Sequence, residues 1–517
     1  MTVDKVDLHT TRRFGTLFLD YLAGKDQLDS FYGSAPNMDS FKAQIDEKKF
    51  PAERRKILCQ ALEEQYQGLP LTDHVKDNLQ KLSKTTTFTI TTGHQLNLFT
   101  GPLYFIYKII TVIKACQDLK AQYPAYDFVP VYWMATEDHD FEEINHFRFS
   151  GKKYQWQTGQ HGAVGRFDLS SFGDFIKTIP GVPGFFKAAY QEKTLAGAVR
   201  HYVNHLFGDY GLLVIDGDHP GLKRQLTGVI KDDILNHTAK SLVDDQSARL
   251  EGLGYKTQVF PREINFFYLD QDVRERIEKD QDGYNVLNTT QKFNKNGLEA
   301  LIEDQPGKFS PNVILRPLYQ EMILPNLAYV GGPAEVAYWL QLKPVFDHYG
   351  EVFPVLLPRN FALIIPAHLG KKWEKTGLSL AALFEEKHSL MARVAVENAD
   401  HKVKLNGQVQ ELVDLFDRIR NQASTIDPTL IPHVEAQQAR TKHKLEGIEK
   451  KFVRAEKRQQ EDRLRQVESV IDDLFPNGNL QERTDNFLDF YLVNPTFIDD
   501  LVKHFEPFDY RFHVAWE

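Results

Sequence analysis

The sequence contains very little cysteine, with only Cys59 and Cys116 among its 517 residues. Two thiols cannot form a disulfide framework or a cysteine-rich metal site. Cys116 lies in an apolar stretch, where an unpaired cysteine more often serves as a small core residue than as a nucleophile. The composition, 42% hydrophobic and 26% charged, is that of an ordinary globular protein.

Long apolar runs and an excess of basic charge are also missing. The first residues, MTVDKVDLHTTRRF, have no apolar core of the kind found in signal peptides. The most apolar helical stretch, Leu103 to Leu119, is interrupted by Lys108 and Lys114 and is too short to span a bilayer. The net charge of -9 argues against a face that neutralises phosphates. We expect a soluble, cytoplasmic protein with no membrane or nucleic-acid partner.

The common nucleotide and hydrolase motifs are absent. No Gly-x-Gly-x-x-Gly follows the first predicted core strand, and no Gly-x-x-x-x-Gly-Lys-Ser/Thr occurs anywhere. No serine lies in a Gly-x-Ser-x-Gly elbow. A functional site therefore has to be sought among less common clusters of polar residues.

What the sequence does contain is a strand-turn-helix-strand unit. Thr85 to Thr92 is rich in β-branched residues and predicts a strand that ends at Gly93. Pro102 marks the start of a helix, and Phe128 to Ala135 predicts a second, almost wholly apolar strand. Such a strand is usually buried on both faces. We therefore predict an α/β fold with a parallel sheet.

Polar clusters follow three of the predicted strands. Gly93-His94-Gln95 follows the first strand, and Glu137-Asp138-His139-Asp140 follows the second. The short apolar strand Gly211 to Ile215 is followed by Asp216 and Asp218. Since ligands gather beyond the carboxyl ends of parallel strands, we expect the functional site at this edge of the sheet.

The acidic cluster admits more than one interpretation. Glu137, Asp138 and His139, with His146 nearby, can ligate a metal or supply an acid and a base. The structural alternative is a helix start at which acidic residues are favoured by the helix dipole. We favour function, because the cluster is denser than capping requires. Asp216 and Asp218 suit a metal or a ribose, but taken alone Asp218 is better explained as a helix N-cap.

A second candidate region lies between Phe309 and Leu342. The turn Gly331-Gly332-Pro333 allows close approach of the backbone to a ligand, and Glu335 and Tyr338 follow on a helix. Arg316 and Gln320 occur among apolar residues, where an unpaired arginine is costly. Arg316 should therefore meet an anion, and a protein carboxylate and a ligand are equally good candidates.

The rest of the chain divides by pattern. Thr257 to Asp270 predicts two short strands around Pro261, followed by a charged helix. The predicted parts are an N-terminal helical region (1–84), a core (85–370) with insertions near 147–210 and 271–308, a helical domain (371–476), and a C-terminal segment that returns to the core (477–517).

The helical domain has the pattern of a coiled coil. Leu405 to Ala423 carries apolar residues on one face, and after Pro432 one uninterrupted helix is predicted up to Pro476. Its apolar spacing slips across the polar stretch Lys457 to Arg463. We predict an antiparallel helical hairpin from about Leu405 to Phe475 whose apolar seam forms a dimer contact.

Four segments carry a resemblance to a known family. They are TGHQLNLFTGPLYFIYKI (Thr92 to Ile109), VPVYWMATEDHDFEEINH (Val129 to His146), FSPNVILRPLYQEMILPNLAYVGGPAEVAYWLQL (Phe309 to Leu342) and QERTDNFLDF (Gln481 to Phe490). Through them the sequence resembles, over most of its length, the bacillithiol biosynthesis cysteine-adding enzymes, a family of cysteine ligases.

The resemblance implies a Rossmann-like core related to class I aminoacyl-tRNA synthetases and other nucleotidyltransferases. It also implies inserted connecting segments and a coiled coil that forms a homodimer. The implied reaction joins cysteine to the amine of glucosaminyl-malate. Gly93-His94-Gln95 occupies the place of the first synthetase signature, and Lys308-x-Ser310 is a remnant of the second. His94 stands where the family pattern leads us to expect glutamine, so no shared catalytic role is carried over to it.

The chemistry of amide formation suggests roles for these residues. A free carboxylate needs activation, so we expect ATP as donor and ADP or a related nucleotide as product, with no metal firmly predicted. The turn after Gly93 and the helix start at Pro102 would present N–H groups to phosphate, and Arg316 or Lys308 would offset developing charge. The predicted catalytic residues are Glu137, Asp138 and His139. The predicted substrate- or nucleotide-binding residues are Thr92, Gly93, His94, Gln95, Thr100, Gly101, Asp216, Asp218, Arg316, Gln320, Gly331, Gly332, Glu335 and Tyr338.

Two other classes of function remain open at this point. One is a metal-dependent hydrolase or transferase. Its ligands would come from Asp138, His139, His146, Asp216 and Asp218. The other is a non-catalytic scaffold organised by the coiled coil, which leaves the polar clusters at the strand ends unexplained.

Overall fold

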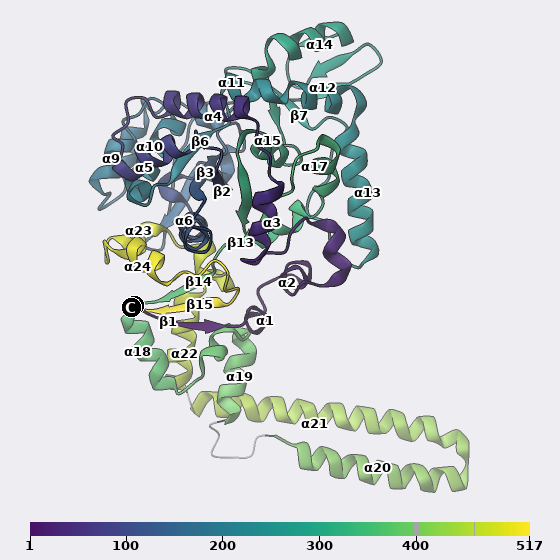
Figure 1. The fold of residues 1–517 in the computed structure, drawn as a ribbon. Helices are drawn as coiled ribbons and strands as arrows, with labels where there is room; N and C mark the ends of the chain where they lie inside the picture. Colours follow the sequence, from purple (N-terminus) through teal and green to yellow (C-terminus); the bar gives the residue numbers. More distant parts are fainter. Residues whose placement is uncertain (398–403, 460) are drawn as a thin grey trace.

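The computed structural model describes residues 1–397, 404–459 and 461–517. Its centre is a five-stranded sheet in the order β13-β12-β2-β3-β6, in which every neighbouring pair is parallel. The predicted α/β fold with a parallel sheet is thus confirmed (Figure 1). The strands are β2 (Thr87–His94), β3 (Asp127–Met134), β6 (Leu213–Asp216), β12 (Asn326–Gly331) and β13 (Val355–Pro358).

Strand β2 lies at the middle of the sheet and is buried along its whole length. The prediction that it ends at Gly93 is wrong by one residue, because Gly93 and His94 still pair with Trp133 and Met134 of β3. The buried threonine hydroxyls find partners inside the sheet. The Thr89 and Thr91 hydroxyls both donate to the Asn326 side-chain oxygen of β12. These bonds allow a polar strand to occupy a core position.

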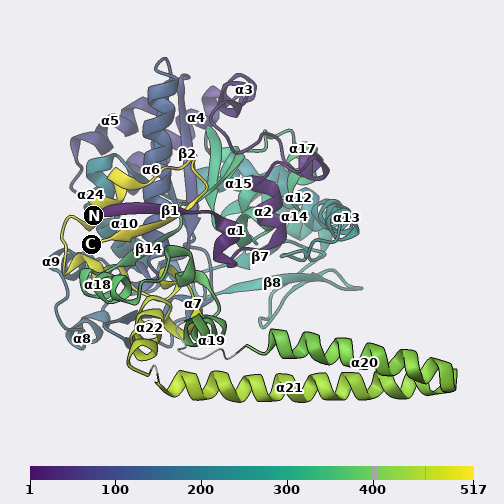
Figure 2. The same ribbon diagram turned by 90° about the horizontal axis from the view of Figure 1, so that it is seen from below.

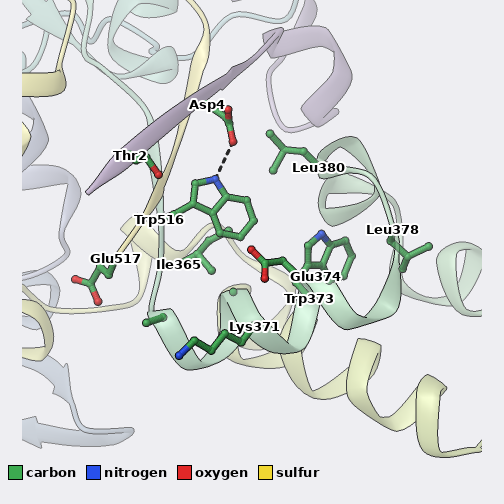
Figure 3. Close-up of a pocket in the computed structure, with 12 residues that line it drawn as sticks. Thr2, Asp4, Ile365, Lys371, Trp373, Glu374, Leu378, Leu380, Trp516 and Glu517 are labelled. Atoms are coloured by element: carbon green, nitrogen blue, oxygen red, sulfur yellow. Dashed lines mark hydrogen bonds between the residues drawn. The ribbon is translucent and has the colours of Figure 1, made fainter.

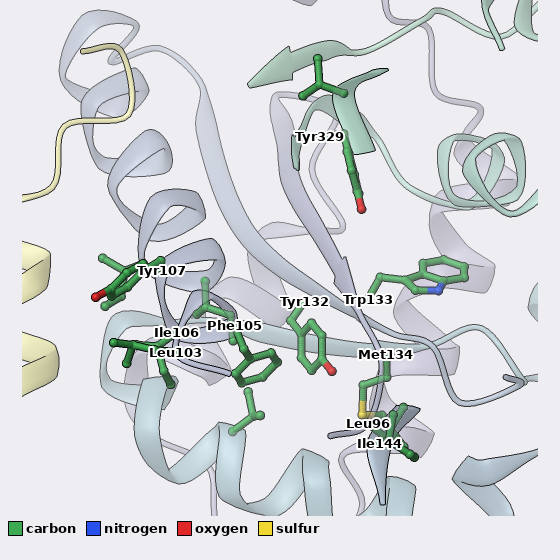
Figure 4. Close-up of a cluster of buried hydrophobic side chains, with 14 of the residues drawn as sticks. Leu96, Leu103, Phe105, Ile106, Tyr107, Tyr132, Trp133, Met134, Ile144 and Tyr329 are labelled. Atoms are coloured by element: carbon green, nitrogen blue, oxygen red, sulfur yellow. The ribbon is translucent and has the colours of Figure 1, made fainter. Parts of the chain in front are cut away.

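Helix α6 (Tyr104–Gln122) connects β2 to β3 and packs on the sheet. Figure 4 shows aromatic side chains of α6 and β3 meeting beneath the strand ends. The rings of Phe105 and Tyr132 meet edge to face, 5.3 Å apart. Lys108, one of the two lysines that interrupt the apolar stretch of this helix, is buried rather than solvated. It is buried because its ammonium bonds to the Gly93 carbonyl and to Glu335 inside the functional site.

The segment after β6 forms a second sheet that sits beside the core (Figure 1). Its strands are β7 (Phe266–Leu269), β8 (Arg274–Lys279), β9 (Tyr284–Val286), β10 (Lys292–Phe293) and β11 (Phe309–Pro311), in the order β10-β9-β8-β7-β11. The predictions of a strand before Pro261 and of a charged helix after Asp270 are wrong. The charged residues of β8 form a strand because they pair in antiparallel register with β7, a tertiary contact that overrides local propensity.

The two ends of the chain lie side by side (Figure 2). β1 (Thr2–Val6) pairs antiparallel with β15 (Phe512–Trp516), which pairs parallel with β14 (Ala362–Ile365). A cavity of about 530 Å³ opens beside this small sheet, between Trp516, Trp373 and Lys371. Figure 3 shows the Trp516 indole donating to Asp4 at its rim, at 2.8 Å. None of the predicted site residues lines this cavity.

The helical domain forms a long antiparallel hairpin that projects from the body (Figures 1 and 2). It consists of α20 (Asn406–Ile426) and α21 (Ile431–Gln459), which pack against each other. The predicted hairpin is confirmed. The predicted continuity of the helix up to Pro476 concerns residue 460, which lies outside the described residues.

The apolar residues predicted to form one coiled-coil seam lie in two different environments, one packed on the body and the other exposed. α22 (Glu461–Leu474) packs on α18 (Ala367–Thr376) and α19 (Lys387–Glu397) of the body. The α22 residues Leu464, Val467 and Leu474 are accordingly buried. The projecting hairpin instead leaves apolar residues exposed. These are Leu415, Ile419, Ile426, Leu430, Ile448 and Phe452.

The remaining elements surround the core. No helix in the described ranges combines the length and apolarity needed to cross a bilayer. The two strands not yet named pair as a hairpin, β4 (His146–Phe149) with β5 (Lys152–Gln155). The other α-helices are α1 (Leu8–Thr11), α2 (Thr16–Leu22), α3 (Ser40–Glu47), α4 (Ala52–Gln65), α5 (Asp73–Lys81), α7 (Phe141–Ile144), α8 (Phe172–Lys177), α9 (Gly184–Ala189), α10 (Leu195–Phe207), α11 (Pro220–Lys223), α12 (Thr227–Asn236), α13 (Thr238–Gly252), α14 (Lys295–Asp304), α15 (Arg316–Ile323), α16 (Pro333–Trp339), α17 (Lys343–Tyr349), α23 (Phe487–Tyr491) and α24 (Phe497–His504).

Candidate active site

A cavity of about 720 Å³ lies at the carboxyl ends of β2, β3 and β12, with the inserted sheet on one side. This is the edge at which the sequence predicts a site. Ten of the predicted residues line it. They are Gly93, His94, Gln95, Glu137, Asp138, His139, Arg316, Gly332, Glu335 and Tyr338.

Glu137 stands at the acidic side of the cavity above a buried lysine. Its carboxylate lies 2.5 Å from the Lys223 ammonium, which also lies 3.0 Å from Asp218. Burial raises the pKa of Glu137, and the Lys223 charge opposes that rise. Asp218 additionally pairs with Arg166 at 2.7 Å. The carboxylate of Glu137 is thus held at the cavity wall by a fixed cation beneath it.

Asp138 and His139 face the cavity beside Arg274, a residue of the inserted strand β8. The Gln95 amide donates to Asp138 at 3.0 Å, and Arg274 lies 3.6 Å from the same carboxylate. Burial opposes ionisation of Asp138, but Arg274, Gln95 and the His139 N–H bring its pKa below the ordinary value. Asp138 is therefore a carboxylate at neutral pH.

Lys108 lies at the opposite side, between the ends of β2 and β12. Its ammonium donates to the Gly93 carbonyl at 2.6 Å and to Glu335 at 2.8 Å. Glu335 also accepts from the Tyr329 hydroxyl at 2.6 Å and from the Gly332 N–H at 2.8 Å. Burial lowers the pKa of Lys108, and the Glu335 carboxylate opposes that effect. Lys108 and Glu335 therefore form a neutral ion pair at the cavity wall.

Arg316 lines the cavity and has no carboxylate within 4.0 Å among the described residues. Its guanidinium donates to the Gln320 side-chain oxygen at 3.1 Å and lies over the Tyr329 ring. A Cβ at Gly93 would lie 3.3 Å from the Tyr329 hydroxyl and 3.4 Å from this guanidinium, so both side chains lie close against the strand at the glycine. Of the two partners that the sequence left open, an anionic ligand is the one that these contacts favour.

The C-terminal segment completes the site. Arg359, which lines the cavity, pairs with Glu482, and both side chains are buried. The next residue, Arg483, also lines the cavity. Asn486 donates to the carbonyls of Phe99 and Gly101, at 2.8 and 2.7 Å, and so ties the segment to the turn after β2.

Three of the N–H groups in the turn that the sequence predicts to bind phosphate already have partners inside the protein. The Phe99 N–H donates to the Tyr190 hydroxyl, the Gly101 N–H to Leu98, and the Leu103 N–H to Asp485. These donors are taken because the turn is packed beneath the C-terminal segment. These three N–H groups are not free for a phosphate, and binding of a nucleotide or small anion elsewhere in the turn stays a prediction.

Several other predicted residues lie behind the cavity wall rather than in it. Asp216 accepts from the Thr136 hydroxyl, and Gln320 stands behind Arg316. Asp218 is not the predicted N-cap either, since His219 holds that position before α11. The predicted residues absent from the lining are Thr92, Thr100, Gly101, Asp216, Asp218, Gln320 and Gly331. Lys308, also considered for charge stabilisation, is outside it and pairs with Asp270 at 2.6 Å.

The five residues proposed for a metal-dependent enzyme are not assembled as a ligand set. In the described parts of the chain, no group of three or more His, Cys, Asp and Glu side chains is placed to hold a metal ion. Asp218 is engaged by Lys223 and Arg166, and the His146 ring contacts Asn145 at 3.0 Å. The geometry gives the metal-dependent alternative no support.

Sequence reasoning missed several charged residues of the site. They are Lys108, Lys223, Arg274, Arg359 and Arg483. Lys108 could have been found from the sequence, because it is one of two lysines that interrupt the apolar stretch Leu103 to Leu119. Arg274 could not have been found from the sequence, because it lies in a charged segment that forms a strand through its pairing with β7.

The fold and the cavity define a Rossmann-like protein that has a ligand site at the carboxyl edge of its sheet and an appended helical hairpin. Family models agree with this division. The N-terminal Rossmann-like domain of bacillithiol biosynthesis BshC matches residues 1–360, and the C-terminal coiled-coil domain of BshC matches residues 362–516.

Full-length relatives point the same way. Proteins with the provisional name cysteine ligase BshC from Cytophaga hutchinsonii, Flavobacterium psychrophilum and Flavobacterium johnsoniae are 39%, 40% and 40% identical to this chain. Each alignment covers 99% of this chain and 99% of the relative. The chain therefore belongs to the bacillithiol biosynthesis BshC family, and the resemblance found in its sequence is confirmed.

Proposed function

We propose that this protein is a cysteine ligase of bacillithiol biosynthesis that joins the carboxyl group of cysteine to the amine of glucosaminyl-malate. Family membership supports the reaction class. The observation that carries the proposal is that both carboxylates and arginine side chains line the cavity. The ionised Asp138 and the neighbouring Glu137 line the same cavity as several arginines that have no carboxylate partner among the described residues.

The arginines that line the cavity can bind the malate part of the acceptor. Arg262 and Arg483 line the cavity, and neither of them forms an ion pair with a described residue. Malate carries carboxylates, which match the planar fork of a guanidinium. These arginines would bind the acceptor and hold its amine toward β3.

The carboxylates that line the cavity can interact with the amino groups of cysteine and of the acceptor. Asp138 and Glu137 can hold the ammonium of cysteine or accept the proton that the attacking amine of the acceptor releases. Both lie directly after β3, and the acceptor would enter between them and the arginines.

ATP is the proposed co-substrate, since an amide does not form from a free carboxylate in water without activation. The cysteine carboxylate would become an acyl adenylate or an acyl phosphate. The amine would then displace the phosphate-containing leaving group. Arg316 is the cation that we assign to offset charge on the transferred group, since Lys108 is already paired with Glu335.

We further propose a homodimer formed through the projecting hairpin, and a cytoplasmic location, where cysteine and ATP are available. The exposed apolar residues of the hairpin support the dimer, because five of them lie on α20 and α21 and a sixth, Leu430, lies in the turn between these helices, on a part of the molecule that projects from the body.

The direct test is reconstitution. Purified protein would be incubated with cysteine, glucosaminyl-malate and ATP, and the product identified by mass spectrometry, with serine in place of cysteine as a control. We expect bacillithiol only with cysteine and ATP present. Thiol profiling of a deletion strain, with and without the gene restored, gives the cellular counterpart. Unchanged bacillithiol in the deletion strain would refute the proposed function.

A further inference from the structure

His139 is held by an arginine that reaches it from the inserted sheet. The distance between Nη1 of Arg274 and Nδ1 of His139 is 2.6 Å. A guanidinium can only donate hydrogen bonds, so Nδ1 has to accept. A histidine whose Nδ1 accepts is neutral and carries its proton on Nε2. Asp138 does not compete for Nδ1, because its nearest oxygen is 3.7 Å away.

Arg274 is itself fixed in place. Its Nε donates to the Ser310 hydroxyl at 3.1 Å and its Nη2 to the Pro311 carbonyl at 3.4 Å. The guanidinium lies over the Phe267 ring at 4.1 Å. Only 8% of the residue is exposed. These contacts leave the guanidinium little freedom to turn away from His139.

The other ring nitrogen of His139 is open to a ligand. The residue lines the cavity, and 46% of its side chain is exposed. None of the described residues forms a hydrogen bond with Nε2. The N–H at this position is therefore available to an acceptor in the cavity.

We infer that Arg274 is a positioning residue that holds His139 as the Nε2–H tautomer, and that His139 donates this N–H to a substrate oxygen on which negative charge develops. The inference rests on the proposed function and deepens it. In this arrangement the proton of the attacking amine passes to a carboxylate, Glu137 or Asp138. The imidazole then takes no proton during the reaction.

The tautomer can be measured without any turnover. Full-length protein with ¹⁵N-labelled histidine would be studied by NMR near pH 7.5, with the His139→Gln variant identifying the His139 signals. We expect a protonated Nε2 and an unprotonated Nδ1. An Nδ1–H tautomer or an imidazolium in the wild-type protein would overturn the role of Arg274.

A matched pair of variants isolates the effect of Arg274. In Arg274→Met the pKa of His139 should rise, because the acidic groups facing the ring remain and the facing cation is lost. Those acidic groups are Asp138, Asp140 and Glu275. Arg276→Met removes the same charge from an exposed position on the same strand and should leave the His139 signals unchanged. Identical His139 titrations in the wild-type and Arg274→Met proteins would count against the inference.

The donor role is tested by isosteres of the two ring nitrogens. A glutamine at 139 can place an amide N–H near the position of Nε2, whereas an asparagine places it near Nδ1, and a phenylalanine offers no donor. His139→Gln should keep about a tenth of the wild-type kcat/KM. His139→Asn and His139→Phe should lose about 100-fold or more, as for removal of a donor to developing charge.

The outcomes separate the inference from the proposed function. Equal loss in all three variants overturns the donor role, even if the wild-type protein makes bacillithiol. A wild-type protein that makes no product overturns the proposed function and the donor role with it. The tautomer measurement still decides the role of Arg274 in that case.

Discussion

At the scale of single residues, the charge on Asp138 is the feature of the cavity that can be removed with least change of shape. Asp138 accepts from Gln95 and from the His139 N–H and lies beside Arg274. An asparagine keeps its volume and one acceptor oxygen but removes the negative charge. The variant therefore separates a chemical role from a packing role.

Asp138→Asn is expected to lower the rate of bacillithiol formation by about 100-fold or more, the usual contribution of a proton acceptor. Its thermal midpoint should stay within about 3 °C of the wild type, since no core contact is lost. Enzyme assays and thermal unfolding measure the two effects. If the variant folds normally and restores wild-type bacillithiol to a deletion strain, Asp138 is not essential to the chemistry.

His94 gives a contrasting prediction, because it lines the cavity but is packed between Tyr104 and Phe105. Burial, with Lys108 nearby, lowers the pKa of His94 to about 4, so the ring is neutral at physiological pH. His94→Gln should therefore be tolerated, with activity within about threefold of the wild type, or roughly 0.7 kcal/mol. A 100-fold loss of activity in a folded variant would show that the imidazole takes part in the reaction.

At the scale of elements, the inserted sheet and the C-terminal segment supply cations to a site whose other residues come mostly from the strands, helices and loops of the core. Arg274 arrives on β8, and Arg483 arrives immediately after the buried Arg359–Glu482 pair. These elements are held to the core by polar contacts as well as by apolar packing. Their attachment can therefore be tested by mutation.

Breaking the Arg359–Glu482 pair should loosen the C-terminal segment. Glu482→Gln leaves a buried arginine without its carboxylate, which typically costs about 3–5 kcal/mol. Urea unfolding should show the loss. The double variant Arg359→Met with Glu482→Leu should recover most of the stability, because neither charge is then left alone. Wild-type stability in Glu482→Gln would mean that the pair is not coupled to folding.

The same segment predicts a dependence of stability on pH. Burial, with Asp489 nearby, raises the pKa of Asp485 to about 7, compared with an ordinary value near 3.8. The folded state therefore holds this proton more tightly than the unfolded state does, and stability is lost as pH rises from about 4 to about 7. Asp485→Asn removes this dependence.

The Asp485→Asn variant should gain about 2 kcal/mol over the wild type at pH 8, which is less than the full shift implies because the carboxyl is partly exposed. At pH 4 the two proteins should have similar stability. Urea unfolding at both pH values measures the difference. A constant offset across this range would show that Asp485 titrates normally.

At the scale of the whole molecule, the projecting hairpin exposes apolar residues that a second copy of the chain would cover. Six exposed apolar residues lie along it, whereas α22 is already packed on the body. A deletion that tests dimerisation should therefore spare α22, since removing Leu464, Val467 and Leu474 would open the core of the body.

Light scattering of the full-length protein is expected to give twice the mass of the chain at micromolar concentration. The double variant Ile426→Glu and Phe452→Glu places charge on exposed apolar positions of the hairpin and should shift the mass to that of a monomer. Unchanged thermal unfolding of the body would serve as the control. A wild-type protein that is already monomeric would exclude the hairpin as a stable dimer contact.

The sequence by itself determined the parts of this protein that periodicity and local chemistry encode. Apolar alternation and proline positions were enough to predict β2, α6 and β3, and helical spacing was enough for the hairpin. The acidic cluster after β3 was predicted at the cavity edge for the same reason, because the carboxyl ends of parallel strands share one edge.

Only the tertiary structure decided which charged side chains contact each other. Arg274 and His139 are 135 residues apart in the chain, and Lys108 and Glu335 are 227 apart. Nothing local in the sequence relates the members of these pairs, because their contact depends on how separate elements pack. The strand conformation of β8 and the pairing of the N–H groups after β2 depend on packing in the same way. Hydrophobic pattern fixes which face of an element is buried, but the partner that it is buried against is set by the assembled fold.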